Sequence, residues 1–237
     1  MFNNKLRYVV VFCLLAVFAG LSTLMAQDDT TVIDLNWSTL TGLGLAEQFV
    51  FLMDENGDLY KVTADSPLSD LQQPIYTMPA ENAADFVFDP FQLTENPLGP
   101  LPAGEALGMT LGDYLGGRGT GTYTLDGDMA TVDASFDRLM PNAVYTLWCS
   151  DLTRPPEFNI VDKPCGAQDG SENNFMSDEY GHLEINMSFP ALAMPTETGL
   201  SVIAIAWHSD GETYGEHPGD FGVVSFVPLR ALLVPNS

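Results

Sequence analysis

The segment Trp207–Phe221, with the sequence WHSDGETYGEHPGDF, carries the densest group of side chains capable of chemistry. Its residues His208, Asp210 and His217 could bind a transition metal, since imidazole and carboxylate ligands suit zinc, copper and nickel. The spacing of the two histidines matches no ligand motif, however, and the glycines and proline around them are equally typical of a connecting loop. The sequence leaves both interpretations open, a metal site or a turn-rich connection.

Two acidic segments place oxygen ligands at alternate positions, as calcium loops do. Asp54, Asn56 and Asp58 fill the first three ligand positions of an EF-hand-type loop, and Asp65 fills its last. The glycine required in the middle of such a loop is missing, and residues 169–173 repeat the pattern with the same departure. We therefore expect no cofactor, with a weakly bound calcium ion or a transition metal as the alternative.

The three cysteines bear on both compartment and stability. Cys13 lies in the apolar N-terminal run, which leaves Cys149 and Cys165 as an even pair. In an oxidising compartment such a pair normally forms a disulfide. No CxxC or CxxxH spacing accompanies the two residues, so a metal-ligand role is disfavoured. The sequence predicts a Cys149–Cys165 disulfide.

Motifs of enzymatic catalysis do not occur in the sequence. Neither a GxSxG nucleophile elbow nor an HExxH metalloprotease motif is present. The chain has 32 acidic residues, so any two carboxylates could converge, and a catalytic pair cannot be singled out. We predict no catalytic residue and favour a non-enzymatic role.

The C-terminal half shows the alternation of apolar and polar residues that is typical of strands with one buried and one solvated face. An Asp-Gly turn at Asp126–Asp128 predicts that its first two strands form a hairpin. The predicted strands are 120–125, 130–137, 143–149, 183–189, 200–207 and 222–229. Short strands separated by turn residues, with no crossover helices between them, indicate an all-β, antiparallel β-sandwich of the Ig-like or jelly-roll-like kind.

The N-terminal half has a weaker pattern. Its expected elements are strands over 32–37, 47–53, 59–64 and 85–88 and one short helix over 105–115, with a proline-rich loop over 90–104. We therefore expect three parts: a signal peptide (1–26), a less regular β-rich N-terminal region (27–117) and an antiparallel β-sandwich domain (118–237).

Two segments of the C-terminal half resemble a known family. The runs FDRLMPNAVYTLWCSD (136–151) and FMSDEYGHLEINMSF (175–189) are similar to the small β-sandwich ectodomain of membrane-bound anti-sigma factors. This resemblance covers about a quarter of the chain and contains no catalytic residue. The chain departs from the family in lacking an internal transmembrane helix and a preceding sigma-binding domain. The resemblance implies an exported sandwich fold and nothing about signalling.

The N-terminus and the charge indicate where the protein acts. Lys5 and Arg7 precede an apolar run over 8–19, and small and polar residues lead to Ala26, as in a signal peptide. An uncleaved membrane anchor is the alternative, since 8–25 is almost long enough to span a bilayer. Removing residues 1–26 takes away two basic residues and no acidic one, which changes the formal charge from −24 to −26. We expect a secreted, periplasmic or cell-surface protein.

The acidic surface also restricts the possible partners. Binding to nucleic acid or to an anionic membrane surface needs clustered lysine and arginine, which this chain lacks. Cations or extracellular ligands remain as candidate partners. The sequence thus predicts an exported acidic β-sandwich protein acting in surface structure, adhesion or ligand binding. The alternative is an extracellular metal-binding protein or metal-dependent enzyme using the 207–221 loop.

The signal peptide leads to a direct prediction. We expect the mature protein to begin at or next to Gln27, because signal peptidase cleaves after a small residue such as Ala26. N-terminal sequencing of material recovered outside the cytoplasm tests this expectation. A sequence beginning at Met1 would favour the uncleaved anchor instead.

Overall fold

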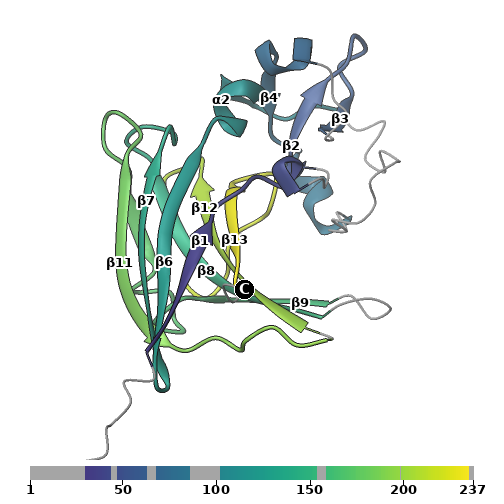
Figure 1. Cartoon of the computed structure of the whole chain (residues 1–237). Helices are drawn as coiled ribbons and strands as arrows, with labels where there is room; N and C mark the ends of the chain where they lie inside the picture. Colours follow the sequence, from purple (N-terminus) through teal and green to yellow (C-terminus); the bar gives the residue numbers. More distant parts are fainter. Residues whose placement is uncertain are drawn as a thin grey trace, which may run out of the picture. The chain divides into compact units, whose positions relative to one another are not determined.

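The computed structural model describes residues 30–43, 47–62, 68–85, 102–153, 159–197 and 199–234 (Figure 1). The predicted signal peptide lies outside these residues. Residues 31–237 belong to one unit, and the description below concerns that unit alone. Within the described ranges, antiparallel strands form three sheets, which we name A, B and C.

Sheet A has the alternating pattern that the sequence indicates. Along its last strand every second residue is buried, from Leu183 to Phe189, and the residues between them are exposed. Its inward side chains are apolar and its outward ones are mainly Thr, Ser, Asp, Asn and Glu. In the order of the sheet, its strands are β1 (Thr31–Asn36), β6 (Arg118–Asp126), β7 (Met129–Asp137) and β11 (Leu183–Pro190).

Sheet B is buried on both of its faces. Eight consecutive residues of its central strand, Ser201–His208, are buried, and so are seven consecutive residues of the neighbouring strand, Ser225–Ala231. Its strands, in sheet order, are β10 (Asn174–Met176), β8 (Val144–Thr153), β12 (Gly199–His208) and β13 (Ser225–Leu232), with β9 (Asn159–Pro164) also paired to β8. Both faces of this sheet must therefore be covered by other parts of the chain.

The inward faces of sheets A and B share one hydrophobic core, which confirms the antiparallel β-sandwich. Trp37 follows β1 and meets Phe136 of β7 edge-to-face, with ring centroids 4.7 Å apart. The backbone N–H of Leu192 donates a 2.8 Å hydrogen bond to the hydroxyl of buried Tyr123. The Tyr123 hydroxyl is thus paired at the edge of the core, whereas the buried indole nitrogen of Trp37 has no hydrogen-bond partner in the described structure.

Sheet C is built from the N-terminal half. Its strands, in sheet order, are β3 (Leu59–Val62), β2 (Glu47–Met53), β4 (Pro74–Tyr76) and β5 (Ala106–Thr110). Short helical segments flank them: the 3-10 turns η1 (Thr41–Leu43), η2 (Leu68–Gln72) and η3 (Ala80–Asp85) and the helix α2 (Leu111–Leu115). Thr110 and Asp113 form a capping box that starts α2.

The predicted helix over 105–115 is wrong in its first half. Residues 106–110 form β5, because Gly108 has a φ of 76° that a helix does not accept, and the helix begins only after the Thr110 cap. The predicted strand over 85–88 begins at the end of η3, and residues 86–88 lie outside the described ranges. The predicted hairpin of β6 and β7 is confirmed, with Gly127 at a φ of 58° in its turn.

The division at residue 117 stays a prediction. The first strand of the N-terminal region, β1, pairs with β6 along six residues and so lies in the sheet of the C-terminal half. Just after β1, the backbones of Ser38 and Arg230 exchange hydrogen bonds of 2.8 and 2.9 Å, which takes the chain from sheet A to sheet B. In the described part of the chain no helix is long and apolar enough to cross a membrane.

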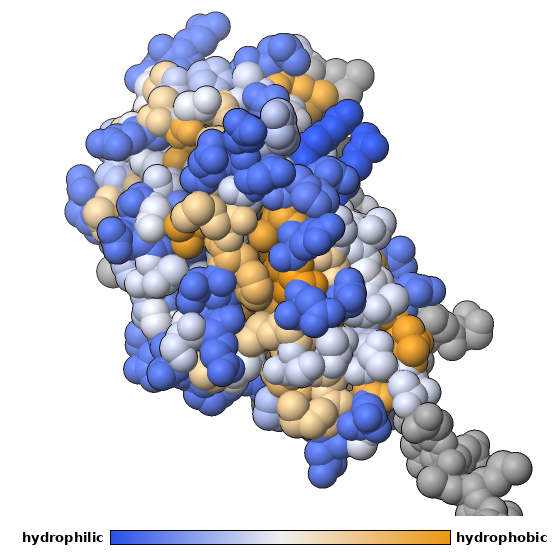
Figure 2. Space-filling view, turned by 90° about the vertical axis from the view of Figure 1, so that its left-hand side faces the viewer, coloured by the Kyte–Doolittle hydropathy of each residue, from blue (hydrophilic) through white to orange (hydrophobic). Residues whose placement is uncertain are grey.

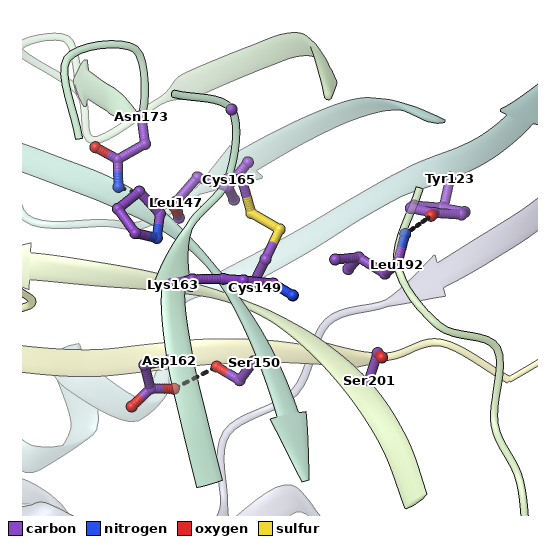
Figure 3. The surroundings of a disulfide bond; sticks show 12 residues. Tyr123, Leu147, Cys149, Ser150, Asp162, Lys163, Cys165, Asn173, Leu192 and Ser201 are labelled. Atoms are coloured by element: carbon purple, nitrogen blue, oxygen red, sulfur yellow. Dashed lines mark hydrogen bonds between the residues drawn. A yellow bond between two sulfur atoms is a disulfide. The ribbon is translucent and has the colours of Figure 1, made fainter. Parts of the chain in front are cut away.

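The predicted disulfide is confirmed. Cys149 on β8 and Cys165, just after β9, are both buried, and their Cα atoms are 5.1 Å apart (Figure 3). The bond lies between β8 and the loop that returns to β10. It fixes the end of β9 beside the strand with which β9 pairs.

Removal of the disulfide should lower the free energy of unfolding by roughly 3 kcal/mol, because the unfolded chain loses a cross-link closing a 16-residue separation. Urea denaturation of Cys149→Ala/Cys165→Ala beside the unmodified protein measures this difference. As a control, a reductant should lower the midpoint of the unmodified protein and leave that of the double variant unchanged. An unmodified protein insensitive to reductant would contradict the prediction.

Candidate functional site

The residues that the sequence singled out for a metal are engaged by different neighbours. His208 is buried at the end of β12, whereas the side chain of His217 is 78% exposed and lies 3.6 Å from Glu216. Asp210 accepts hydrogen bonds from the Tyr214 hydroxyl and from a backbone N–H. Among the residues that the structure describes, no group of three His, Cys, Asp or Glu side chains could hold a metal ion. A metal at His208, Asp210 and His217 stays a prediction without a ligand cluster to support it.

His208 instead ends a short chain of buried hydrogen bonds. The indole N–H of Trp148 donates to the Thr146 hydroxyl at 2.6 Å, and that oxygen lies 2.8 Å from Nε2 of His208. Burial lowers the pKa of His208, and the charge of Asp210 opposes this effect only partly. Burial therefore favours the neutral imidazole, and the network orients Trp148 on the outer face of sheet B.

The two acidic segments are turns stabilised by their own side chains. Oδ1 of Asp54 accepts from the backbone N–H of Asn56 and Asp58 at 2.8 and 2.9 Å. Oδ1 of Asp169 accepts from the N–H of Ser171 at 3.0 Å. These hydrogen bonds lower the pKa of both aspartates, with the bond from Asp58 and the bonds from Ser171 as the largest causes. The aspartates act as turn residues here, and calcium binding stays a prediction.

The feature with the form of a binding site is a cavity of about 690 Å³ on the outer face of sheet B. This volume lies in the range of small-molecule sites. Its described walls are predominantly aliphatic and aromatic, and Asp162 and Arg230 are the two charged residues among them. A second cavity, of about 730 Å³, is lined by His208, by Asp210 and by many residues of the neighbouring loops. The first cavity fits the usual pattern of an apolar site with few polar groups.

Small side chains at the centre of sheet B create the depth of the first cavity. Ala204 and Ala206 on β12 lie between Trp148 on β8 and Arg230 on β13, and strand pairing places Ala204 directly beside both of them. Opposite the sheet, Phe49 of β2 and Phe221 stack with ring centroids 4.5 Å apart. The N-terminal region thus covers the outer face of sheet B incompletely and leaves a space above the two alanines.

One charged group of the cavity, Asp162, is accessible to solvent. Ser150 on β8 donates a 2.5 Å hydrogen bond to Oδ1 of Asp162 on β9 (Figure 3). Asp162 is exposed, yet the surrounding protein raises the pKa of its carboxyl, because desolvation outweighs the hydrogen bond from Ser150 and the charge of Arg230. Within the described chain, no hydrogen bond reaches its second carboxylate oxygen. Because Asp162 lines the cavity, this oxygen is a candidate acceptor for a ligand there.

The second charged group, Arg230, is buried with several other polar atoms. Its Nη1 and Nη2 atoms, Oε2 of Glu47 and the hydroxyl of Tyr114 are inaccessible and have no hydrogen-bond partner in the described structure. Burial lowers the pKa of Arg230 and raises that of Glu47, while the attraction between the two charges opposes both shifts. The guanidinium also lies over the Phe49 ring, 5.9 Å from its centroid. These groups join sheet C to sheet B at one side of the cavity.

Sequence reasoning did not identify Asp162, Arg230 or Glu47. A signal is present for two of them, since Arg230 interrupts the apolar strand SFVPLRAL and Glu47 begins the apolar strand EQFVFLM. A charged residue in a strand buried on both faces needs a partner or a function. Asp162 has no such signal, because β9 itself was not predicted.

No protein-family model matches the chain, and a search of curated proteins finds no match. The similarity to anti-sigma factor ectodomains stays a prediction. The geometry described above is therefore the basis of the functional proposal.

The neutral state of His208 has a consequence for stability. Its pKa is lower in the folded protein than in the unfolded chain, so the unfolded chain takes up a proton first as the pH falls. We expect the contribution of His208 to the free energy of unfolding to decrease between pH about 7.5 and about 5.5, the range in which histidine titrates. Urea denaturation at both values measures this change, which should be smaller in His208→Gln.

His182 provides the matched control for this experiment. A hydrogen bond to Asp137 is the main cause that raises its pKa, so its contribution to stability has the opposite sign and grows as the pH falls. His182→Gln should therefore make the loss of stability on acidification larger. Identical pH dependence in the unmodified protein and His208→Gln would contradict the assignment.

Proposed function

We propose that this chain is an exported, non-enzymatic β-sandwich protein that binds a small apolar ligand in the cavity on the outer face of sheet B. Of the roles that the sequence predicts, surface structure, adhesion and ligand binding, the cavity favours the last. The observation that carries the proposal is an apolar space of about 690 Å³ above Ala204 and Ala206, with one accessible carboxylate at its side.

Export is supported by two independent features. The N-terminal sequence has the pattern of a signal peptide, and the Cys149–Cys165 disulfide is typical of proteins that act in an oxidising compartment. The strongly acidic composition suits a protein that stays dispersed in extracellular water. On the face drawn in Figure 2, hydrophilic residues lie on both sides of hydrophobic ones that extend through its middle. An apolar ligand in the cavity would gain a dry site on a strongly acidic carrier.

Filling the cavity tests the proposal. Nile red, a neutral dye whose fluorescence rises in apolar surroundings, should bind the purified protein, and Ala204→Phe should weaken binding at least about tenfold by occupying the space. Leu232→Trp is a second variant that narrows the cavity, at a partly exposed position away from Ala204 and Ala206. Asn186→Phe, on the exposed face of β11, is the size-matched control.

Circular dichroism and the state of the disulfide confirm that each variant is folded. Binding that is lost in the two cavity variants and kept in Asn186→Phe would support the site. Equal dye binding in all four proteins, or none in the unmodified protein, would overturn the proposal.

A further inference from the structure

The charges around the cavity restrict what the ligand can be, given that the proposed function is correct. Asp162 presents an accessible carboxylate, and Arg230 lies behind the wall with the opposite charge. Each of the two charges stabilises the ionised form of the other. The cavity therefore carries no excess positive charge that would attract an anion.

An anionic head group would be poorly placed here. The Nη atoms of Arg230 are inaccessible, so the residue lines the cavity through the rest of its side chain and cannot donate to a ligand without moving. The accessible charge is that of Asp162, which repels an anion, and buried Glu47 adds a second carboxyl near Arg230. An ionised head without a partner is costly to desolvate among apolar walls.

A cationic head group is disfavoured for a related reason. It could approach Asp162, but the guanidinium of Arg230 would repel it, and the apolar walls would still remove its water. A hydroxyl group avoids both penalties. It can donate a hydrogen bond to the second oxygen of Asp162, which accepts none from the residues that the structure describes.

We propose that the ligand is an uncharged amphipathic molecule, of the long-chain alcohol or monoacylglycerol kind. Its hydroxyl head donates to Asp162 at the accessible side of the cavity, and its apolar chain lies over Ala204 and Ala206. The stacked rings of Phe49 and Phe221 cover the chain from the other side. Desolvating an ionised head among the apolar walls is costly, which selects against ligands that carry a full charge of either sign.

Three ligands with the same alkyl chain test the head group. Dodecanol, dodecanoate and dodecyltrimethylammonium are compared near neutral pH as competitors of Nile red, each below the concentration at which it aggregates. Dodecanol should compete at least about tenfold more strongly than either ion, since it alone donates a hydrogen bond without carrying a charge into the cavity.

Two variants separate the hydrogen bond from the charge balance. Asp162→Asn should weaken dodecanol about tenfold, as expected for a hydrogen bond to a charged group, whereas Asp126→Asn, outside the cavity, should have no effect. Arg230→Met removes the positive charge that acts on both Asp162 and Glu47, so dodecyltrimethylammonium should gain affinity. If Arg230→Met does not fold, the comparison of the three dodecyl ligands on the unmodified protein and on Asp162→Asn still tests the proposal.

The outcomes distinguish the ligand class from the site. If dodecanoate or dodecyltrimethylammonium binds most tightly, or if dodecanol does not compete, the proposal of an uncharged ligand is wrong. Binding of Nile red would in that case still support the cavity as the binding site. Loss of Nile red binding itself would overturn the proposed function as well. A preference for dodecanol that disappears in Asp162→Asn would support both the uncharged ligand and the cavity as its binding site.

Discussion

The burial of both faces of sheet B is the constraint on which the other features of this protein depend. β12 and β13 have almost no solvent-exposed residue, unlike β11 of sheet A, where every second residue is exposed. One face of sheet B packs against sheet A. The other face needs a cover, which η1 and β2 of the N-terminal half supply together with the segment at Phe221 of the C-terminal half.

The cover is held to sheet B by polar as well as apolar contacts. Arg230 exchanges backbone hydrogen bonds with Ser38, and its buried side chain lies within electrostatic reach of Glu47 and Tyr114. Burying such groups without hydrogen bonds is costly, so they are expected where they fix a specific arrangement or serve a site. Here they stand beside the space that the cover leaves open over Ala204. The cavity thus results from an incomplete fit between two parts of one chain.

The sequence predicted the sandwich better than the cavity. Strict alternation in β7 and β11 and the Asp-Gly turn identify sheet A, since a sheet with one wet face leaves a period of two in the sequence. Of the strands of sheet B, β8, β12 and β13 were predicted from their apolar runs, but their second buried face has no signature of its own. β5 was taken for part of a helix, and β9, which carries Asp162, has an irregular polar sequence. Residues that meet only through packing between distant elements, such as Ala204 and Phe49, cannot be paired from one sequence.

The way β8 is covered along its free side has a further consequence. Two short strands share that side, β10 along Val144–Thr146 and β9 along Trp148–Thr153. At Leu147, between them, the backbone is satisfied by Asn173 and by Cys165, whose disulfide holds the intervening loop. The sheet therefore ends in two brief, interrupted segments. Another chain would find no continuous row of backbone donors and acceptors to extend there, so this margin of the sheet resists the strand-by-strand growth that leads to aggregates.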